Sequence, residues 1–221
     1  MISYWQQSAW FDRTDVAVIG GGIVGLSAAI HLQISEPALR VSLFEKGAIP
    51  AGATTRNAGF ACFGSVSELA DDLSHRPANE VWTLARQRFE GLNLLRSMTG
   101  DEAIRYEACG GYEVFSSPEE HEVYLAHIPA MNQALKTYTG LKNTFSVPKE
   151  TAGSFGFSGL TGLIFNRHEG AIHSGKLAQA LMDKARHLGV QLFYGFDVAE
   201  IGSESNGAHI RFRTPELALS A

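Results

Sequence analysis

The sequence has few cysteines, no long apolar run and no run of like charge. Its 221 residues include two cysteines, Cys62 and Cys109, whose wide separation fits no metal-ligand spacing and predicts free thiols in a reducing compartment. None of its apolar segments reaches the ~18 residues that a membrane-spanning helix needs. Residues 1–7 lack the basic segment of a secretory signal. These absences predict a soluble, cytoplasmic protein with no membrane partner.

The charge and composition also narrow the class of partner. The net charge is −5, and the lysines and arginines form no basic stripe of the kind that nucleic-acid-binding proteins carry. Hydrophobic residues make up 45% and charged residues 19%, as in ordinary globular proteins. We therefore expect one large or two small domains and no nucleic-acid partner.

A strand–helix–strand unit is predicted near the N-terminus. Residues 15–19 are a β-branched apolar run followed by glycines, which is typical of a buried parallel strand. Residues 23–33 are small and apolar and predict a buried helix, and residues 41–44 predict the next strand. This order defines a βαβ unit, for which a right-handed crossover is expected.

The turn between the first strand and the helix has the pattern G-x-G-x-x-G at Gly20, Gly22 and Gly25. The first glycine permits a tight turn, the second lets the backbone approach a pyrophosphate, and the third lets the helix pack closely on the sheet. The free N–H groups of the helix N-terminus, at Ile23 and Val24, attract phosphate. The pattern predicts a dinucleotide site.

Glu45 ends the second predicted strand, where a carboxylate accepts hydrogen bonds from the adenosine ribose hydroxyls. The same charge repels a 2′-phosphate, which argues against NADP. The alternative is a glycine-rich turn that happens to precede a surface glutamate.

The loop over residues 47–61 favours FAD over NAD. Thr54 and Thr55 offer hydroxyl donors to a pyrophosphate, and Arg56 offsets phosphate charge. The small residues Ala58 and Gly59 would let backbone N–H groups approach a flat ring. An NAD site needs no such loop at this point, although an ordinary surface loop remains the alternative.

The middle of the chain has another character. Residues 78–99 carry a helical apolar stripe, residues 112–115 predict a strand, and residues 119–138 predict a helix that Pro129 should kink or split. Residues 141–168 are expected to form strands and loops. We assign roughly 70–170 to an inserted or second layer of the fold.

The pattern returns to α/β after residue 170. A helix is predicted from Ser174 to a terminating Gly189, followed by strands over 190–194 and 198–201. Asn206-Gly207 predicts a hairpin turn into a returning strand over 209–213.

These segments together resemble the D-amino-acid oxidase superfamily, which includes glycine, sarcosine and gamma-glutamylputrescine oxidases. The resemblance rests on residues 15–45, on the loop 52–59, and on 169–177 with 189–198. It implies a Rossmann-like FAD-binding domain with a parallel sheet and helices, incomplete here and formed by residues 1–69 with 170–221. It also implies part of an α+β substrate or cap domain with an antiparallel sheet over residues 70–169. It implies that Val198 meets the adenine through its backbone. The expected cofactor contacts are Gly20, Gly22, Ile23, Val24, Gly25, Glu45, Lys46, Thr54, Thr55, Arg56, Asn57, Ala58, Gly59 and Val198.

The resemblance also implies an activity, namely hydride transfer to flavin from a carbon bearing an amine, in a small-molecule amine or amino acid. Two alternatives remain: an FAD-dependent hydroxy-acid dehydrogenase, and a non-catalytic dinucleotide-binding or structural remnant. Members of the superfamily run well beyond this length, so the resemblance implies an N-terminal portion with weak or absent turnover alone. No catalytic residue and no oligomeric state is predicted.

Several other residues are of a type that could carry function. His168, Glu169 and His173 are spaced one residue wider than the H-E-x-x-H zinc motif, so we expect no metal. Arg105, Tyr106, Tyr112 and Glu113 are candidates for a substrate pocket, with ordinary sheet-surface roles favoured. Residues 1–14 are expected to be an arm packed on the body of the protein.

Overall fold

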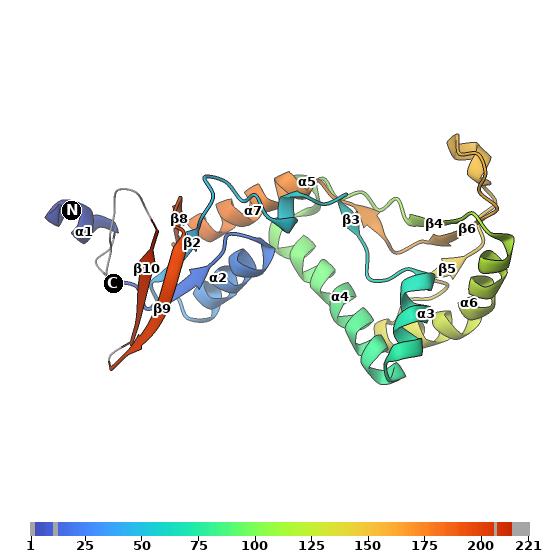
Figure 1. Ribbon diagram of the computed structural model, residues 1–221, viewed down its shortest axis with the longest axis horizontal. Helices are drawn as coiled ribbons and strands as arrows, with labels where there is room; N and C mark the ends of the chain where they lie inside the picture. The colour runs from blue at the N-terminus through green and yellow to red at the C-terminus, as the bar shows by residue number, and fades with distance from the viewer. Residues whose placement is uncertain (1–2, 11–12, 206, 214–221) are drawn as a thin grey trace. The chain divides into compact units, whose positions relative to one another are not determined.

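The computed structural model describes residues 3–10, 13–205 and 207–213. The chain forms two compact units, one of residues 1–58 with 174–221 and one of residues 59–173 (Figure 1). The first unit is therefore assembled from the two ends of the chain, and the second is inserted between them.

The first unit is built on a parallel sheet. Strands β1 (Val16–Ile19), β2 (Val41–Glu45) and β8 (Gln191–Tyr194) lie in the order β1-β2-β8. Helix α2 (Ile23–Ser35) connects β1 to β2, and α7 (Ser174–His187) precedes β8 and packs against α2. The strand–helix–strand prediction is thus confirmed, and the α/β class with it.

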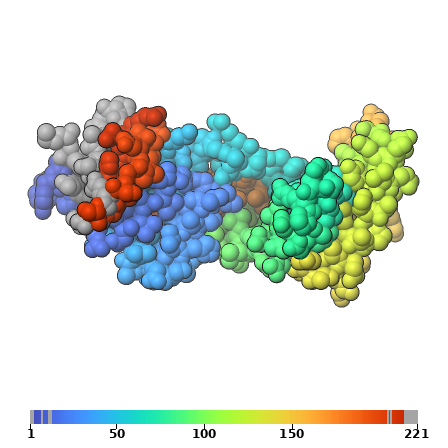
Figure 2. Space-filling model, turned by 60° about the horizontal axis from the view of Figure 1, so that its bottom comes forward, coloured from blue at the N-terminus to red at the C-terminus, as the bar shows by residue number. Residues whose placement is uncertain are grey.

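An antiparallel hairpin of β9 (Val198–Glu204) and β10 (Gly207–Phe212) belongs to the same unit. Phe44 of β2 stacks on Phe193 and contacts Phe212, with ring centroids 5.1 and 4.8 Å apart. Because successive strand residues face opposite sides of a sheet, the hairpin packs on the side of Phe44, away from Leu43. Figure 2 shows the hairpin, in red, beside the blue N-terminal part of the chain. Asn206 of the predicted turn lies outside the described residues.

Short elements complete the first unit. Helix α1 (Tyr4–Trp10) precedes the sheet, and a 3-10 turn, η1 (Ala53–Thr55), follows β2 and packs against α7. The glycine-rich turn and the loop that carries η1 therefore belong to one compact unit.

The second unit packs helices on an antiparallel sheet. Strands β4 (Gly111–Phe115), β6 (Gly162–Asn166) and β5 (Phe145–Ser146) lie in the order β4-β6-β5, and β3 (Phe60–Ala61) pairs with β7 (Gly170–Ala171). The remaining elements are α3 (Val66–His75), α4 (Ala78–Thr99), α5 (Asp101–Ile104), α6 (Pro118–Thr139) and η2 (Ala152–Phe155). The core of this unit includes Phe63, Leu69, Trp82, Phe115, Met131, Leu135 and Ile164.

Helix α6 departs from the sequence expectation, because it runs unbroken through Pro129 and is not split there. Proline removes one intrahelical hydrogen bond and frees the carbonyl four residues earlier. Pro129 itself is exposed, and Met131 and Leu135 anchor the following turns of the helix in the core.

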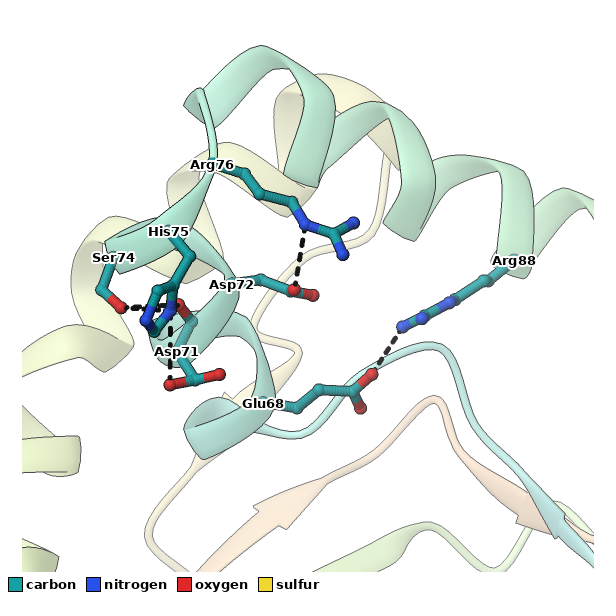
Figure 3. A network of polar contacts seen from close by, with 7 residues as sticks. All are labelled: Glu68, Asp71, Asp72, Ser74, His75, Arg76 and Arg88. Carbon is teal, nitrogen blue, oxygen red and sulfur yellow. Dashed lines mark hydrogen bonds and ion pairs between the residues drawn. The ribbon is translucent and has the colours of Figure 1, made fainter.

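Polar contacts hold α3 against α4 on the surface of the second unit. Arg88 Nη1 lies 2.7 Å from Glu68 Oε1, and i,i+4 pairs join Asp72 to Arg76 and Asp71 to His75 (Figure 3). These side chains are solvent-accessible, and exposed ion pairs stabilise a protein by less than about 1 kcal/mol. The network is a surface feature of the helix pair.

Candidate cofactor site

The glycine-rich turn has the backbone that its sequence requires. Gly20 has φ +102°, a conformation that L side chains rarely adopt, and its N–H donates to Phe44 O at 2.8 Å. A Cβ atom at Gly25 would collide with the carbonyl oxygen of Gly20. The turn out of β1 and the close approach of α2 therefore depend on glycine at both positions.

The N-terminus of α2 faces the loop that follows β2. Gly22 precedes the helix in an extended conformation, and Ile23 N donates to Thr54 Oγ1 at 2.9 Å. A Cβ atom at Gly22 would lie 3.1 Å from the same oxygen. The first-turn amides of Val24 and Gly25 have no acceptor within a helix, and the Val24 side chain is 80% exposed. This helix terminus offers donors and a partial positive charge to an anion.

The Glu45 carboxylate bridges two backbone segments. Its Oε2 accepts from Gly21 N at 2.7 Å, and its Oε1 accepts from Gly47 N at 2.9 Å. An ionised carboxylate has about four acceptor positions, so two remain for ribose hydroxyls. Gly21 and Gly47 were missed by sequence reasoning. Gly47 lies two residues after Glu45 in the sequence, whereas Gly21 lies 24 residues before it and is brought to the carboxylate by the fold.

The loop after β2 is closed by its own side chains. Thr55 Oγ1 donates to Pro50 O at 2.8 Å, and Asn57 Nδ2 donates to the carbonyls of Ala53 and Thr54 at 2.9 and 2.8 Å. The Thr55 hydroxyl hydrogen is thereby used inside the loop. The Thr54 hydroxyl accepts from the helix and keeps its hydrogen to donate.

The other predicted contacts differ in exposure. Lys46, Arg56 and Ala58 are exposed. Gly59 is buried at φ +77°, and a Cβ atom there would collide with the carbonyl oxygen of Ile172. The carbonyl oxygen of Gly59 accepts a hydrogen bond from Ile172 N at 2.8 Å. The N-terminal segment of the first unit ends at Ala58, and the second unit begins at Gly59.

Val198 is placed by the segment that follows β8. Gly195 N donates to Gly47 O at 3.1 Å and Phe196 N donates to Glu45 O at 3.0 Å, so this segment is bonded directly to the end of β2. Val198 then begins β9. The predicted ribose and adenine contacts thus lie on segments that are hydrogen-bonded to one another.

These residues fit FAD. The site combines a cradle that a Cβ at Gly22 would narrow, helix amides, a hydroxyl at Thr54 and a pre-oriented carboxylate at Glu45. A pyrophosphate requires the first three, and an adenosine ribose requires the last.

Several titratable groups with shifted pKa values lie in the second unit. Burial raises the pKa of Glu169 to about 7, the bond from Asn166 Nδ2 to Oε1 at 3.0 Å lowers it, and Glu113 and Glu68 raise it further. Burial, then the charge of Glu169, raises the pKa of the Cys62 thiol. Glu113 caps α3 by accepting from Val66 N, Ser67 N and the Ser67 hydroxyl.

The candidate pocket residues of the second unit have separate partners. The Arg96 guanidinium lies 3.8 Å from the centroid of the Tyr106 ring, and Tyr112 packs on Phe155 and Phe165 at 4.9 and 4.7 Å. Arg105 ends α5 in a left-handed conformation with φ 50°. These contacts give each of the three side chains its own neighbours in the second unit.

The described part of the chain shows neither a cluster of metal ligands nor a helix that could span a membrane. Within residues 3–10, 13–205 and 207–213, no group of three or more metal-ligating side chains lies together. In the same part of the chain, none of the helices combines the length and hydropathy needed to cross a bilayer.

The βαβ unit, its glycine turn and its terminal carboxylate define a dinucleotide-binding α/β protein. The sequence pattern of the family described as FAD dependent oxidoreductase matches residues 15–218. The chain belongs to this family, and the family cofactor is FAD, as the sequence predicted.

Individual relatives give the same picture. The chain is 27% identical over 199 residues to the glycine oxidase of Geobacillus kaustophilus (strain HTA426), covering 88% of this chain and 49% of that protein. It is 25% identical over 198 residues to the L-2-hydroxyglutarate dehydrogenase of Indibacter alkaliphilus, covering 88% and 45%. The crystal structure of glycine oxidase from Bacillus cereus ATCC 14579 superposes with a TM-score of 0.64 at 25% identity, covering 91% of this chain and 52% of that one. The chain spans about half the length of these relatives.

Proposed function

We propose that the protein oxidises a primary or secondary amine, or an amino acid, by hydride transfer to FAD. The observation that carries the proposal is the similarity to glycine oxidases in both sequence and fold, at 27% and 25% identity. We further propose that the first unit holds the cofactor, through the residues predicted above, and that the second unit forms part of the substrate domain.

When bound, FAD supplies a ring that accepts a hydride and so needs no nucleophilic side chain. The protein's residues bind and orient. The α2 amides and the Thr54 hydroxyl are positioned to hold the pyrophosphate, and Glu45 is positioned to hold the ribose. Such fixed donors and acceptors lower the entropic cost of binding and hold the cofactor in one orientation.

The second candidate is oxidation of a hydroxy acid. It is favoured by one observation, the 25% identity to a relative named L-2-hydroxyglutarate dehydrogenase. Both reactions remove a hydride from carbon, so the cofactor site does not distinguish them. The distinction depends on groups that meet the amine or the hydroxyl.

The first experiment is a visible absorption spectrum of the purified protein, with the supernatant after heat denaturation assayed for FAD. A flavin spectrum and released FAD are expected, and a protein that neither carries nor takes up FAD would contradict the cofactor assignment. Bleaching of the flavin under anaerobic conditions by glycine, sarcosine or larger amines, but not by 2-hydroxy acids, supports the amine reaction. Bleaching by hydroxy acids alone would replace it with the second candidate.

A further inference from the structure

The antiparallel sheet of the second unit packs its own helices on one face only. Phe115 of β4 belongs to the core that α3, α4 and α6 build with the sheet (Figure 1). Successive strand residues alternate between faces, so Tyr112 and Val114 of β4 lie on the other face. Their partners there are Phe165 and Leu163 of β6. These four residues define the outer face of the sheet.

Three aromatic rings meet on this outer face and form an aromatic cluster of Tyr112, Phe155 and Phe165. The Tyr112 ring lies 4.7 Å from the Phe165 ring and 4.9 Å from the ring of Phe155, the last residue of η2, at interplanar angles of 40° and 55°. The Phe165 ring lies close against β4, because a Cβ atom at Gly110 would collide with it. Tyr112 and Phe155 are nevertheless 41% and 45% exposed. The cluster is thus held in place by its own contacts and is open to solvent.

The charge of the second unit favours a cationic ligand. The net charge of −5 belongs to this unit, because acidic and basic residues are equal in number over residues 1–58 and 174–221. The summed charge of a unit attracts small ions of the opposite sign to its surface. A cation is therefore drawn to the second unit, and an anion is repelled from it.

The chemistry of the outer face is complementary to one kind of cation. The face of an aromatic ring is the negative part of its quadrupole, and it attracts an ammonium or guanidinium group within about 6 Å of its centroid. The second unit already contains such a contact, since the Arg96 guanidinium lies 3.8 Å from the centroid of the Tyr106 ring. Val114 adds aliphatic surface beside the cluster. Rings with aliphatic surface suit an ammonium ion that carries alkyl groups.

We propose that the aromatic cluster binds an organic ammonium ion whose nitrogen is fully alkylated. The positive nitrogen lies over the rings of Tyr112 and Phe155, and its methyl groups pack on Val114. Full alkylation is favoured because ring faces and a valine accept no strong hydrogen bond, so an ammonium that donates none loses least on leaving water. The site consists of residues of the second unit and is independent of the reaction proposed above.

The test compares three probes of nearly the same shape that differ in charge: choline, 3,3-dimethyl-1-butanol and 3,3-dimethylbutanoate. Each is titrated into the ¹⁵N-labelled, FAD-supplemented protein, and the backbone amide signals of Tyr112 and Val114 are followed. We expect saturable shifts with choline, binding of the neutral alcohol that is weaker by on the order of tenfold, and still weaker binding of the acid. Equal affinity for choline and the alcohol would overturn the proposal, because the outer face would then be a plain apolar surface.

Variants locate the site. Tyr112→Leu and Phe155→Leu keep an apolar side chain and remove one ring, so each should weaken choline binding about two- to fivefold and change the affinity for the alcohol less. Trp5→Leu removes a ring of the first unit that is 76% exposed, and this matched control should bind choline as the wild type does. Two further results would overturn the proposal. One is the absence of a saturable shift with choline, as expected if polypeptide covers the outer face. The other is unchanged choline binding in both ring variants at an unchanged melting temperature.

Discussion

Glu45 and Gly21 are joined by a hydrogen bond of 2.7 Å from the glycine N–H to Oε2 of the carboxylate. The other carboxylate oxygen accepts from Gly47 N at 2.9 Å. The acid at the end of β2 is thus held in one orientation by backbone on two sides before any ligand enters. Binding to such a fixed group loses less conformational entropy than binding to a mobile one.

The first prediction concerns Glu45→Gln. The substitution keeps the side-chain shape and removes the charge. It also places the amide NH₂ group, which is a donor, against the N–H donor of either Gly21 or Gly47. FAD affinity should fall by on the order of 10–100-fold, because a hydrogen bond to a charged group contributes about 1.5–3 kcal/mol. Quenching of FAD fluorescence on titration with flavin-free protein measures the Kd. Glu200→Gln, which removes an exposed partner of Arg211, is the control. An unchanged Kd for Glu45→Gln would remove Glu45 from the site.

The second prediction compares a glycine that lies against neighbouring backbone with a glycine that has open space beside it. A Cβ at Gly25 would meet the Gly20 carbonyl, whereas a Cβ at Gly91, inside α4, would meet nothing within 4 Å. Gly25→Ala should lower the free energy of unfolding by about 1–3 kcal/mol through overpacking. Gly91→Ala should raise it by about 0.5–1 kcal/mol, since alanine is the better helix former. Urea unfolding of both variants measures these changes, and a neutral Gly25→Ala would show that the turn tolerates displacement of α2.

The cofactor turn was predictable from the sequence because its parts are close in the chain. Gly20, Gly25 and Glu45 lie within one βαβ unit, whose strands and helix have clear apolar patterns. The α/β class was predicted from the same unit, whereas the antiparallel second sheet and the FAD-dependent family were predicted from the resemblance, and all three are confirmed. The assignment of individual cofactor contacts stays a prediction.

Other features had weak or no local signal. Helix α3 was not predicted, although Ser65 accepts from Glu68 N, a capping pattern visible in the sequence. Strands β3 and β7 have two residues each, too short for a period. The buried Gln33 side chain donates to the carbonyl oxygens of Pro37 and Leu39, contacts for which the sequence carries no pattern.

The third prediction distinguishes two neighbouring hydroxyls. Thr54 Oγ1 accepts from Ile23 N and keeps a hydrogen for a phosphate, whereas the hydrogen of Thr55 is used on Pro50 O. Thr54→Val should weaken FAD binding by about tenfold, the value of one hydrogen bond to a charged group, with recovery in Thr54→Ser. Thr55→Val should lower stability by about 1 kcal/mol and change the Kd less. The reverse order in the FAD titration would assign the phosphate contact to Thr55.

The last prediction concerns Glu169, whose carboxyl pKa is raised further above its ordinary value than that of any other carboxyl group among the described residues. Its Oε1 accepts from Asn166 Nδ2 at 3.0 Å, and its Oε2 occupies the space that a Cβ at Gly111 would take. Burial is the main cause of a pKa of about 7 against an ordinary value of 4.5. At a pH between these two values, the folded protein keeps a proton on Glu169 that the unfolded chain has released.

The sign of the pH dependence follows. Since the native state binds more protons between about pH 4.5 and 7, the free energy of unfolding falls as the pH rises through that interval. The contribution of Glu169 is fully present below the lower value and is lost above the upper one. Glu169→Gln keeps an oxygen for Asn166 and cannot ionise, so its stability should exceed that of the wild type increasingly from pH 5 to pH 8. Urea unfolding at steps of pH measures the difference, with Glu122→Gln, at an exposed position of α6, as the control. A wild type and Glu169→Gln with parallel profiles across this range would mean that Glu169 is ionised in the folded protein well below pH 7.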